Sequence, residues 1–229
     1  MTFLLTNDDG IDAAGLAALQ MAAQSIASRV IVVAPAVEQS MCGHRVTTHS
    51  PLKVEKRGPD RWAVHGTPAD CVRVALFGLN LTPDWVLSGI NHGGNMGQDL
   101  YISGTVAAVR EATYHGVKAM AFSHYIVSGI DFDWARTARW TQRMMTNLLA
   151  EPLPADHFWN TNYPHLPPGD FELPKQIRTW PARSPLNVSF HRDGDLLQYN
   201  ARYSARPQDA GSDVEACFGE FVSVSAVSI

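Results

Sequence analysis

Two adjacent carboxylates, Asp8 and Asp9, lie near the N-terminus of the chain. Neighbouring carboxylates at a strand end repel each other and lose hydration, so one of them tends to take a proton unless a cation compensates. A hard divalent ion such as Mg²⁺ or Mn²⁺, which prefers oxygen ligands, would compensate, and Ser40 and Asn91 could add neutral oxygens. The residues alone also allow a solvated turn at Gly10, because Asp-Asp-Gly is a short and common string.

A glycine-rich segment, residues 89–97, and the later string Ser103-Gly104-Thr105 form a second chemical element. Glycines let the backbone approach a ligand closely, and a helix N-terminus offers N–H groups and the positive end of the helix dipole. Together they could bind a phosphate. Taken alone, such a segment is more often a mobile loop in which Thr105 caps the next helix. It is not a Walker loop, because no Gly-Lys-Ser/Thr string follows.

Histidines are the candidate bases, although a lone histidine is usually a hydrogen-bonded or surface residue. The candidates are His44, His65, His92, His115 and His124. His44 is the strongest, because it lies in the loop 40–44 beside the proposed metal site. The absence of a Gly-x-Ser-x-Gly elbow disfavours a serine hydrolase.

The spacing of apolar residues predicts the elements that must position these side chains. Residues 2–6 and 30–34 are apolar runs typical of strands, and residues 12–28 between them carry leucine, isoleucine and alanine at helical spacing, so the first unit is βαβ. Thr67 is the expected N-cap of a further helix, with Pro68 at its first position and Asp70 in its first turn. Further predicted strands cover 62–65, 85–88 and 118–123, and further helices 105–114 and 133–149. This alternation predicts an α/β fold with a mostly parallel, right-handed, doubly wound sheet.

Polar clusters follow four of the predicted strands, at residues 7–10, 38–40, 88–95 and 123–124. In an open parallel sheet, ligands bind in the crevice outside the carboxyl ends of the strands. We therefore expect the carboxylate pair, Ser40, Asn91 and the glycine-rich segment to converge at one edge of the sheet.

The last third of the chain has a different character. Prolines interrupt it, and strand-like stretches cover residues 158–163, 176–180, 196–199 and 221–225. We predict a single domain over residues 1–229, with a core of about 1–150 and a β-rich extension of about 151–229. Such an extension, built of hairpins or an arm, often serves subunit association.

Composition excludes several classes of function. Apolar residues make up 45% of the 229 positions, and no apolar run approaches the roughly 18 residues of a membrane span. A net charge of −4 argues against binding a nucleic acid polymer, although a small phosphorylated ligand is compatible with it. Three widely spaced cysteines fit neither a disulfide framework nor a zinc site. The N-terminus lacks the features of a signal peptide, so a cytoplasmic location is expected.

Five strings in the same order closely resemble the SurE (survival protein E) family of 5′/3′-nucleotidases. They are Thr6-Asn7-Asp8-Asp9-Gly10-Ile11; Val33-Ala34-Pro35 with Gln39-Ser40 and Gly43-His44; Gly66-Thr67-Pro68-Ala69-Asp70-Cys71-Val72; Ser88-Gly89-Ile90-Asn91 with Gly94-Asn95-Met96-Gly97; and Ser103-Gly104-Thr105-Val106. Each string is weak alone, but the ordered set is specific. The resemblance covers about the first 125 residues well and then thins.

The resemblance implies a Rossmann-like three-layer core, one divalent metal ion, Mg²⁺ or Mn²⁺, and release of phosphate from nucleoside 5′-monophosphates, with 3′-monophosphates as a further expected substrate. By position, the implied metal ligands are Asp8, Asp9, Ser40 and Asn91, with Asp8 and Asp9 also catalytic. The implied phosphate-binding residues are Asn95, Ser103, Gly104, Thr105, Gly43 and His44. It also implies a homodimer or homotetramer formed through an exchanged C-terminal segment.

Two alternatives and one mechanistic choice remain open from the sequence. A receiver-like regulator also carries an acidic pair after its first strand, but it would need an aspartate and a lysine at later strand ends, where this chain has Ser88 or Asn91 and Ser123-His124. A nucleotide-binding module without turnover would use the same residues. Either a water activated on the metal or Asp9 itself could attack phosphorus.

Overall fold

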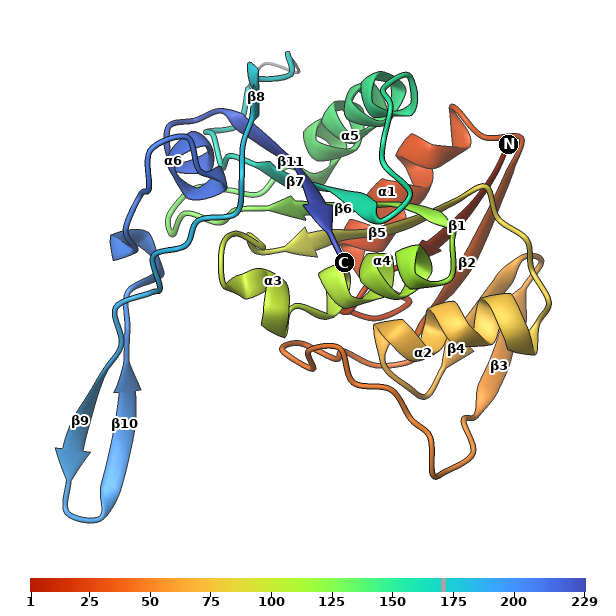
Figure 1. Cartoon of the computed structure of the whole chain (residues 1–229), viewed down its shortest axis with the longest axis horizontal. Helices are drawn as coiled ribbons and strands as arrows, with labels where there is room; N and C mark the ends of the chain where they lie inside the picture. The colour runs from red at the N-terminus through yellow and green to blue at the C-terminus, as the bar shows by residue number, and fades with distance from the viewer. Residues whose placement is uncertain (170–171) are drawn as a thin grey trace.

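The computed structural model describes residues 1–169 and 172–229. In these ranges nine strands form one sheet in the order β3-β4-β2-β1-β5-β6-β7-β11-β8, and the hairpin β9–β10 projects away from it (Figure 1). The strands are β1 (Thr2–Thr6), β2 (Arg29–Pro35), β3 (Val54–Gly58), β4 (Arg61–Val64), β5 (Trp85–His92), β6 (Lys118–His124), β7 (His157–Tyr163), β8 (Gln176–Arg178), β9 (Ser189–Asp193), β10 (Leu196–Asn200) and β11 (Val222–Ser228).

Helices cover both faces of this sheet. They are α1 (Ala14–Gln24), α2 (Pro68–Arg73) with a π-helical turn (Val74–Gly78), α3 (Asp99–Ile102), α4 (Gly104–Tyr114), α5 (Trp134–Leu149), a 3₁₀ turn (Tyr203–Ala205) and α6 (Asp213–Phe218). Buried residues of α1 and α5 share one apolar cluster, and those of α2 and α4 share another. The prediction of an α/β fold with a three-layer core is confirmed.

Parallel pairing dominates around the N-terminal strand. β1 pairs in parallel with β2 on one side and with β5 on the other, and β6 and β7 continue the parallel ladder. The antiparallel pairs within this sheet, among the described residues, are β3 with β4 and β7 with β11. The chain therefore proceeds from β1 to β2 in one direction and returns to β5 on the opposite side of β1.

The predicted start of α2 is confirmed in detail. Thr67 Oγ1 accepts a hydrogen bond from the Asp70 backbone N–H, the Asp70 carboxylate accepts one from the Thr67 N–H, and Pro68 begins the helix. This reciprocal capping box satisfies two N–H groups that would otherwise lack partners.

The last third both completes the sheet and forms the predicted arm. β7, β11 and β8 extend the central sheet, whereas every residue of β9 and β10 is exposed. Sequence patterning did not reveal β3, α3, β9 or α6. β3 reads Val-Glu-Lys-Arg-Gly and lies at a sheet edge, so it lacks the apolar run of a central strand, while α3 and α6 have only 4 and 6 residues. The division into a core of about 1–150 and an extension of about 151–229 stays a prediction.

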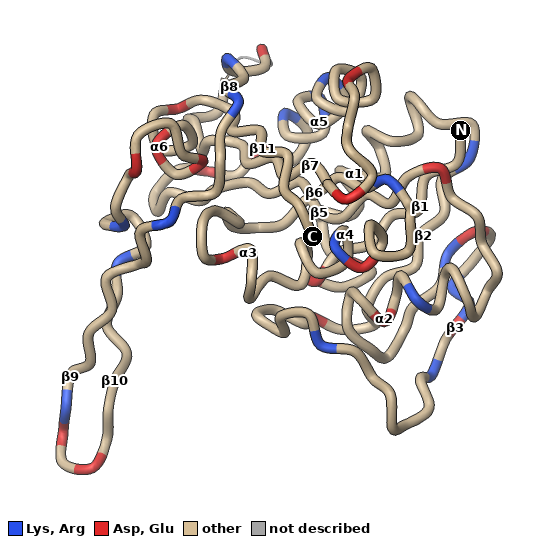
Figure 2. The backbone as a smooth tube through the Cα atoms, viewed as in Figure 1, with Lys and Arg blue, Asp and Glu red and all other residues tan. Residues whose placement is uncertain are grey.

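Charged residues are distributed over separate elements (Figure 2). Residues of both signs occur along the chain, and the hairpin carries Arg192, Asp193 and Asp195. None of the described helices is long and apolar enough to cross a membrane.

Candidate active site

The carboxylate pair lies where the strand order reverses. Asp8 and Asp9 directly follow β1, which lies between β2 and β5. A crevice at such a switch point is the usual ligand site of an open α/β sheet. The expected convergence at the carboxyl ends of β1 and β5 is therefore present in the structure.

Asp8 is almost fully buried and faces the start of α4. The hydroxyl of Thr105 donates a hydrogen bond to Asp8 Oδ1. Burial raises the pKa of Asp8 to about 6, and the charge of Asp9 acts in the same direction, while hydrogen bonds from the Thr105 side chain and from the backbone of Asp8 and Thr105 oppose the rise. The anion at the α4 N-terminus in this structure is thus the Asp8 carboxylate itself.

Asp9 is more accessible and points towards β5. Its Oδ2 atom accepts a hydrogen bond of 3.3 Å from the backbone N–H of His92. Burial raises the pKa of Asp9, and the Glu38 carboxylate adds to the effect, whereas His92 opposes it. The two carboxylates therefore have different surroundings, one beside α4 and the other beside the end of β5.

Gly104 allows the close approach of α4 to Asp8. A Cβ atom at Gly104 would lie 2.8 Å from the Asp8 Cβ and 3.0 Å from the Cys42 Sγ. Residues 39–43 close this corner from the other side: the Gln39 N–H donates to the Asp8 carbonyl at 2.7 Å, and the Gly43 N–H donates to the carbonyl of Ile102, the last residue of α3, at 3.0 Å. Gly43 and Gly104 are thereby brought to the same side of the carboxylate pair.

The neutral candidate ligands have other partners in this structure. Ser40 is exposed, and its hydroxyl donates to Glu38 Oε1 at 2.6 Å. Asn91 donates its amide N–H to the Gly93 carbonyl at 2.9 Å, which leaves its amide oxygen as the atom that can accept or coordinate. No three His, Cys, Asp or Glu side chains of the described residues come together as metal ligands. A cation at Asp8 and Asp9 would accordingly need neutral oxygens, and such an all-oxygen donor set fits a hard divalent ion.

Asn95 and Ser103, predicted to bind phosphate, are firmly held. Asn95 donates its side-chain N–H to Ser123 Oγ at 2.8 Å, and its carbonyl accepts from Asn160 and Asn162 at 3.0 Å. Ser103 is the N-cap of α4 and accepts the Val106 N–H at 3.1 Å. Asn95 is thus fixed against β6 and β7 and Ser103 at the start of α4, and their role towards phosphate stays a prediction.

His44, the preferred candidate base, is paired with a buried glutamate. Its Nε2 atom donates to Glu111 Oε2 at 2.6 Å, and Arg73 and His115 bind the other carboxylate oxygen at 2.5 and 2.8 Å. Burial alone would raise the pKa of Glu111, but the hydrogen bonds from His44, Arg73 and His115 outweigh it and lower the pKa to about 2. Only the Glu111/His115 spacing on one helix face hinted at this cluster in the sequence.

His124 is a packed core residue. Its ring lies 4.4 Å from the Phe132 ring, 6.1 Å from that of Trp140 and 5.3 Å from that of His165. Burial, assisted by nearby positive groups, lowers its pKa to about 3. A histidine held neutral among aromatic rings is suited to packing, as a lone histidine usually is.

Sequence reasoning missed the residues that anchor the glycine-rich loop. Arg206 is buried and donates to Asp99 Oδ2 at 2.6 Å and to the Met96 carbonyl at 3.1 Å, while Asp213 accepts the Gly97 N–H at 2.9 Å. These contacts join positions more than 100 residues apart, so no local pattern could reveal them. They fasten the segment after the hairpin to the loop after β5.

Comparisons with known proteins identify a family and a solved structure that this chain resembles. The family model described as survival protein SurE matches residues 3–183. A relative from Nostoc sp. is 45% identical over 230 residues, covering 100% of both chains. A Rhodospirillum rubrum protein named 5′-nucleotidase SurE is 36% identical over 233 residues, covering 99% of this chain and 89% of the relative. The crystal structure of the SurE protein from Aquifex aeolicus superposes with a TM-score of 0.87 at 33% identity, covering 100% of this chain and 93% of that one.

Proposed function

The chain belongs to the SurE family, and from this premise we propose that it is a 5′-nucleotidase, a phosphomonoester hydrolase that releases phosphate from nucleoside 5′-monophosphates. The 3′-monophosphates are a further proposed substrate. The name 5′-nucleotidase is carried by relatives that match nearly the whole chain. The single observation that carries the proposal is the buried carboxylate of Asp8 at the β1/β5 switch point, beside the N-terminus of α4.

A divalent ion, Mg²⁺ or Mn²⁺, is part of the proposal. Asp8, Asp9 and the amide oxygen of Asn91 would hold it, and Ser40 would join after its hydroxyl turns away from Glu38. Bound there, the ion would polarise the phosphoryl group and acidify a water molecule. The raised pKa values of both aspartates support this assignment, because a buried carboxylate pair favours a compensating cation.

The residues of the chain have separate tasks in this proposal. Thr105 fixes the orientation of Asp8 through its hydroxyl, and the His92 N–H fixes Asp9. Asp9, the more accessible carboxylate, accepts the proton of the attacking water or attacks phosphorus itself. Gly104 lets the N-terminus of α4 approach Asp8 closely, and Gly43, Asn95, Ser103 and His44 border the phosphate.

The nucleophile can be identified directly. Rapid acid quenching during turnover, with a labelled phosphate group, would trap a phosphoenzyme if Asp9 attacks phosphorus. Direct entry of one oxygen-18 from solvent into phosphate, with no phosphoenzyme in a single turnover, would instead identify water.

Phosphate release from AMP and GMP with Mn²⁺ tests the activity and the site together. We expect hydrolysis by the wild-type chain and a loss of about 100-fold or more in kcat for Asp9→Asn. Asp12→Asn is the matched control, because the Asp12 side chain is 88% exposed and follows the same turn. Unchanged activity in Asp9→Asn would reject the metal site, and binding of AMP without any hydrolysis would favour a nucleotide-binding module.

The partners of the chain are also part of the proposal. We propose a homodimer or homotetramer that associates through the C-terminal segment, supported by exposed apolar side chains on the hairpin at Phe190, Leu196, Leu197 and Tyr199. The interspersed charges in Figure 2 support a small nucleotide ligand rather than a nucleic acid polymer or a membrane. Three free cysteines support a cytoplasmic location.

A further inference from the structure

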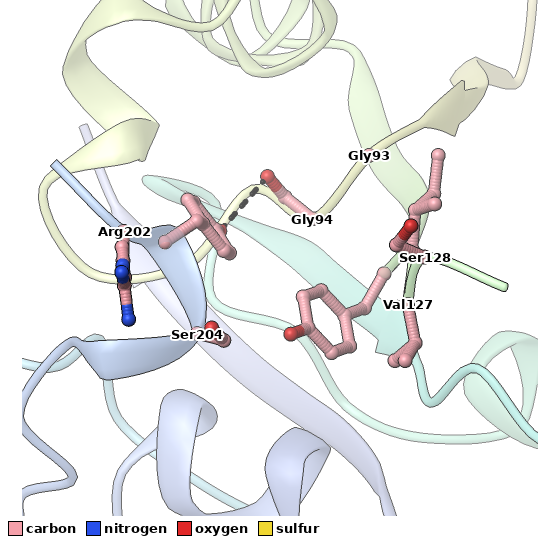
Figure 3. A pocket seen from close by; sticks show the side chains of 9 residues that line it. Gly93, Gly94, Val127, Ser128, Arg202 and Ser204 are labelled. Carbon is pink, nitrogen blue, oxygen red and sulfur yellow. Dashed lines mark hydrogen bonds between the residues drawn. The ribbon is translucent and has the colours of Figure 1, made fainter. Parts of the chain in front are cut away.

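A cavity of 580 Å³ opens beside the glycine-rich loop (Figure 3). Three segments far apart in the chain line it: Gly93-Gly94 after β5, residues 125–128 after β6, and residues 202–204 after the hairpin. Its volume is within the usual range of small-molecule sites, roughly 300–1,000 Å³. The carboxylate pair is absent from its lining, so the cavity is separate from the chemistry itself.

The cavity nevertheless begins beside the carboxylate pair. His92, whose N–H binds Asp9, immediately precedes Gly93 on the cavity wall, and consecutive Cα atoms are about 3.8 Å apart. A smaller cavity of 290 Å³ is lined by Asp9, His92 and Trp134. The smaller cavity is at the low end of ligand-site volumes. A substrate whose phosphate lies at Asp9 therefore has more room for its organic part in the larger cavity, past Gly93, than in the smaller one.

Aromatic rings make one wall of the larger cavity rigid. The Tyr125 ring stacks on Phe218 with a centroid distance of 4.8 Å and on Tyr203 at 5.9 Å. The Tyr203 hydroxyl donates to Asp99 Oδ2 at 2.7 Å, and the buried Arg206 binds the same oxygen. These contacts set the wall in place before any ligand arrives, which lowers the entropic cost of binding.

Polar groups at the rim add hydrogen-bonding capacity. Arg202 lies across the cavity from Val127 and Ser128 (Figure 3). Its guanidinium has no hydrogen-bond partner within residues 1–169 and 172–229, and it is exposed. A planar donor group opposite an aromatic wall matches a nucleobase, which has π-faces for stacking and ring or carbonyl acceptors at its edge.

We infer that this cavity is the nucleoside subsite, where Tyr125 and Arg202 bind the base of the nucleoside monophosphate whose phosphate lies at the carboxylate pair. The inference rests on the proposed function and names the part of the chain that recognises the base. Because residues 202–204 begin two positions after the end of β10, the wall that they form belongs to the segment that also anchors the hairpin.

Substrates that lack one part of the nucleotide test this inference. AMP has a base and a phosphate, ribose 5-phosphate lacks the base, and adenosine lacks the phosphate. The variant Ser128→Trp fills the cavity from an exposed position, and Arg202→Ala removes its donors. Ser50→Trp, at an exposed serine outside the cavity, is the matched control.

For both cavity variants we expect the ratio of kcat/KM for AMP to kcat/KM for ribose 5-phosphate to fall about 10-fold or more relative to the wild type, and no change in Ser50→Trp. Adenosine should inhibit ribose 5-phosphate hydrolysis by the wild type and lose that effect in Ser128→Trp. An unchanged ratio in both cavity variants would overturn the inference.

Calorimetric binding of adenosine separates this inference from the proposed function. If the wild type hydrolyses neither phosphate ester, the proposed function fails, and adenosine binding decides the role of the cavity alone. Binding that is lost in Ser128→Trp and retained in Ser50→Trp supports the subsite. Equal binding by the two variants, or no binding by the wild type, rejects it.

Discussion

Asp8 is the residue at which separate parts of the chain meet. Thr105 donates to its carboxylate, Gln39 donates to its carbonyl, and Gly104 packs against its Cβ. Burying a carboxylate costs free energy unless hydrogen bonds or a cation compensate for its lost hydration. For Asp8, the Thr105 hydroxyl supplies such a hydrogen bond. The orientation of Asp8 therefore depends on the side chain at position 105.

Replacing Thr105 with Val should impair the site while the fold is kept. The loss of a hydrogen bond to a charged group corresponds to about 1.5–3 kcal/mol, so kcat/KM for AMP should fall by about 10- to 150-fold. Thr105→Ser keeps the hydroxyl and should restore most of the activity. Thr113→Val on the same helix removes a hydroxyl that donates only to a backbone carbonyl, and it is the control. Equal kcat/KM values for the Val and Ser variants would contradict this role.

The sequence was sufficient to predict that Asp8 and Asp9 lie together at the end of a strand, but not to predict the hydrogen bonds that they form. The strand-end rule predicted that the carboxylate pair and the end of β5 would lie at the same edge of the sheet, and Asp9 does accept the His92 N–H there. The contact of Asp8 with Gly104 and Thr105 is a finding of the structure. Spacing could not show that Thr105 binds the carboxylate, because this depends on how far α4 lies along the sheet. The pairing of His44 with Glu111 joins residues 67 positions apart and was equally hidden.

Glu111 gives a prediction about pH. Its pKa is lowered from the ordinary 4.5 to about 2 in the folded chain, so its ionised form favours folding. That contribution is complete above pH 4.5 and is lost as the pH falls towards 2, because the unfolded chain binds the proton first. Urea denaturation from pH 6 to pH 3 should show a steeper loss of unfolding free energy for the wild type than for Glu111→Gln. The difference between the pKa of Glu111 in the unfolded and in the folded chain corresponds to about 3 kcal/mol of unfolding free energy.

The exposed Glu220 provides the control for this experiment. Glu220→Gln should retain the pH dependence of the wild type. If the unfolding free energy of the wild type and of Glu111→Gln changes with pH in the same way, the ionised Glu111 does not stabilise the fold.

Among the elements, α2 shows how a short helix is fixed by its first turn. Asp70 closes the capping box and also accepts from the Thr47 N–H and hydroxyl, both at 2.8 Å. The carboxylate thereby ties the loop after β2 to the helix. The Thr67-Pro68-Ala69-Asp70 string predicted the cap, but the contact with Thr47 needs the fold.

Asp70→Ala should accordingly destabilise the chain more than the loss of a cap alone. A substituted cap costs about 1 kcal/mol, and the two contacts with Thr47 add to it, so we expect about 3 kcal/mol in urea denaturation. Thr67→Ala retains the contacts with Thr47 but removes the cap and the hydrogen bond from the Thr67 hydroxyl to the Arg45 carbonyl at 2.6 Å, so it should cost about 2 kcal/mol by the same measurement. If the two variants are equally stable, the loop is not held through Asp70.

At the scale of the whole molecule, the hairpin contrasts with the rest of the last third. The strands β7 and β11 lie in the central sheet, whereas β9 and β10, among residues 1–169 and 172–229, pair only with each other and project from the body (Figure 1). An isolated two-stranded hairpin is marginally stable in water. Four apolar side chains on it are more than half exposed, at Phe190, Leu196, Leu197 and Tyr199. Such a hairpin would gain stability by packing against a second copy of the chain.

A variant in which residues 189–200 are replaced by a short glycine-serine turn tests this association. Because Ser189 and Asn200 are cross-strand partners, the ends to be joined are adjacent and the body should fold. Light scattering after gel filtration should give a dimer or tetramer for the wild type and a smaller species for the variant. The double variant Phe190→Asp/Leu197→Asp keeps the hairpin and should shift the mass in the same direction. Identical masses for all three chains would mean that association, if present, uses another surface, because the apolar side chains of the hairpin would then contribute no contact between copies.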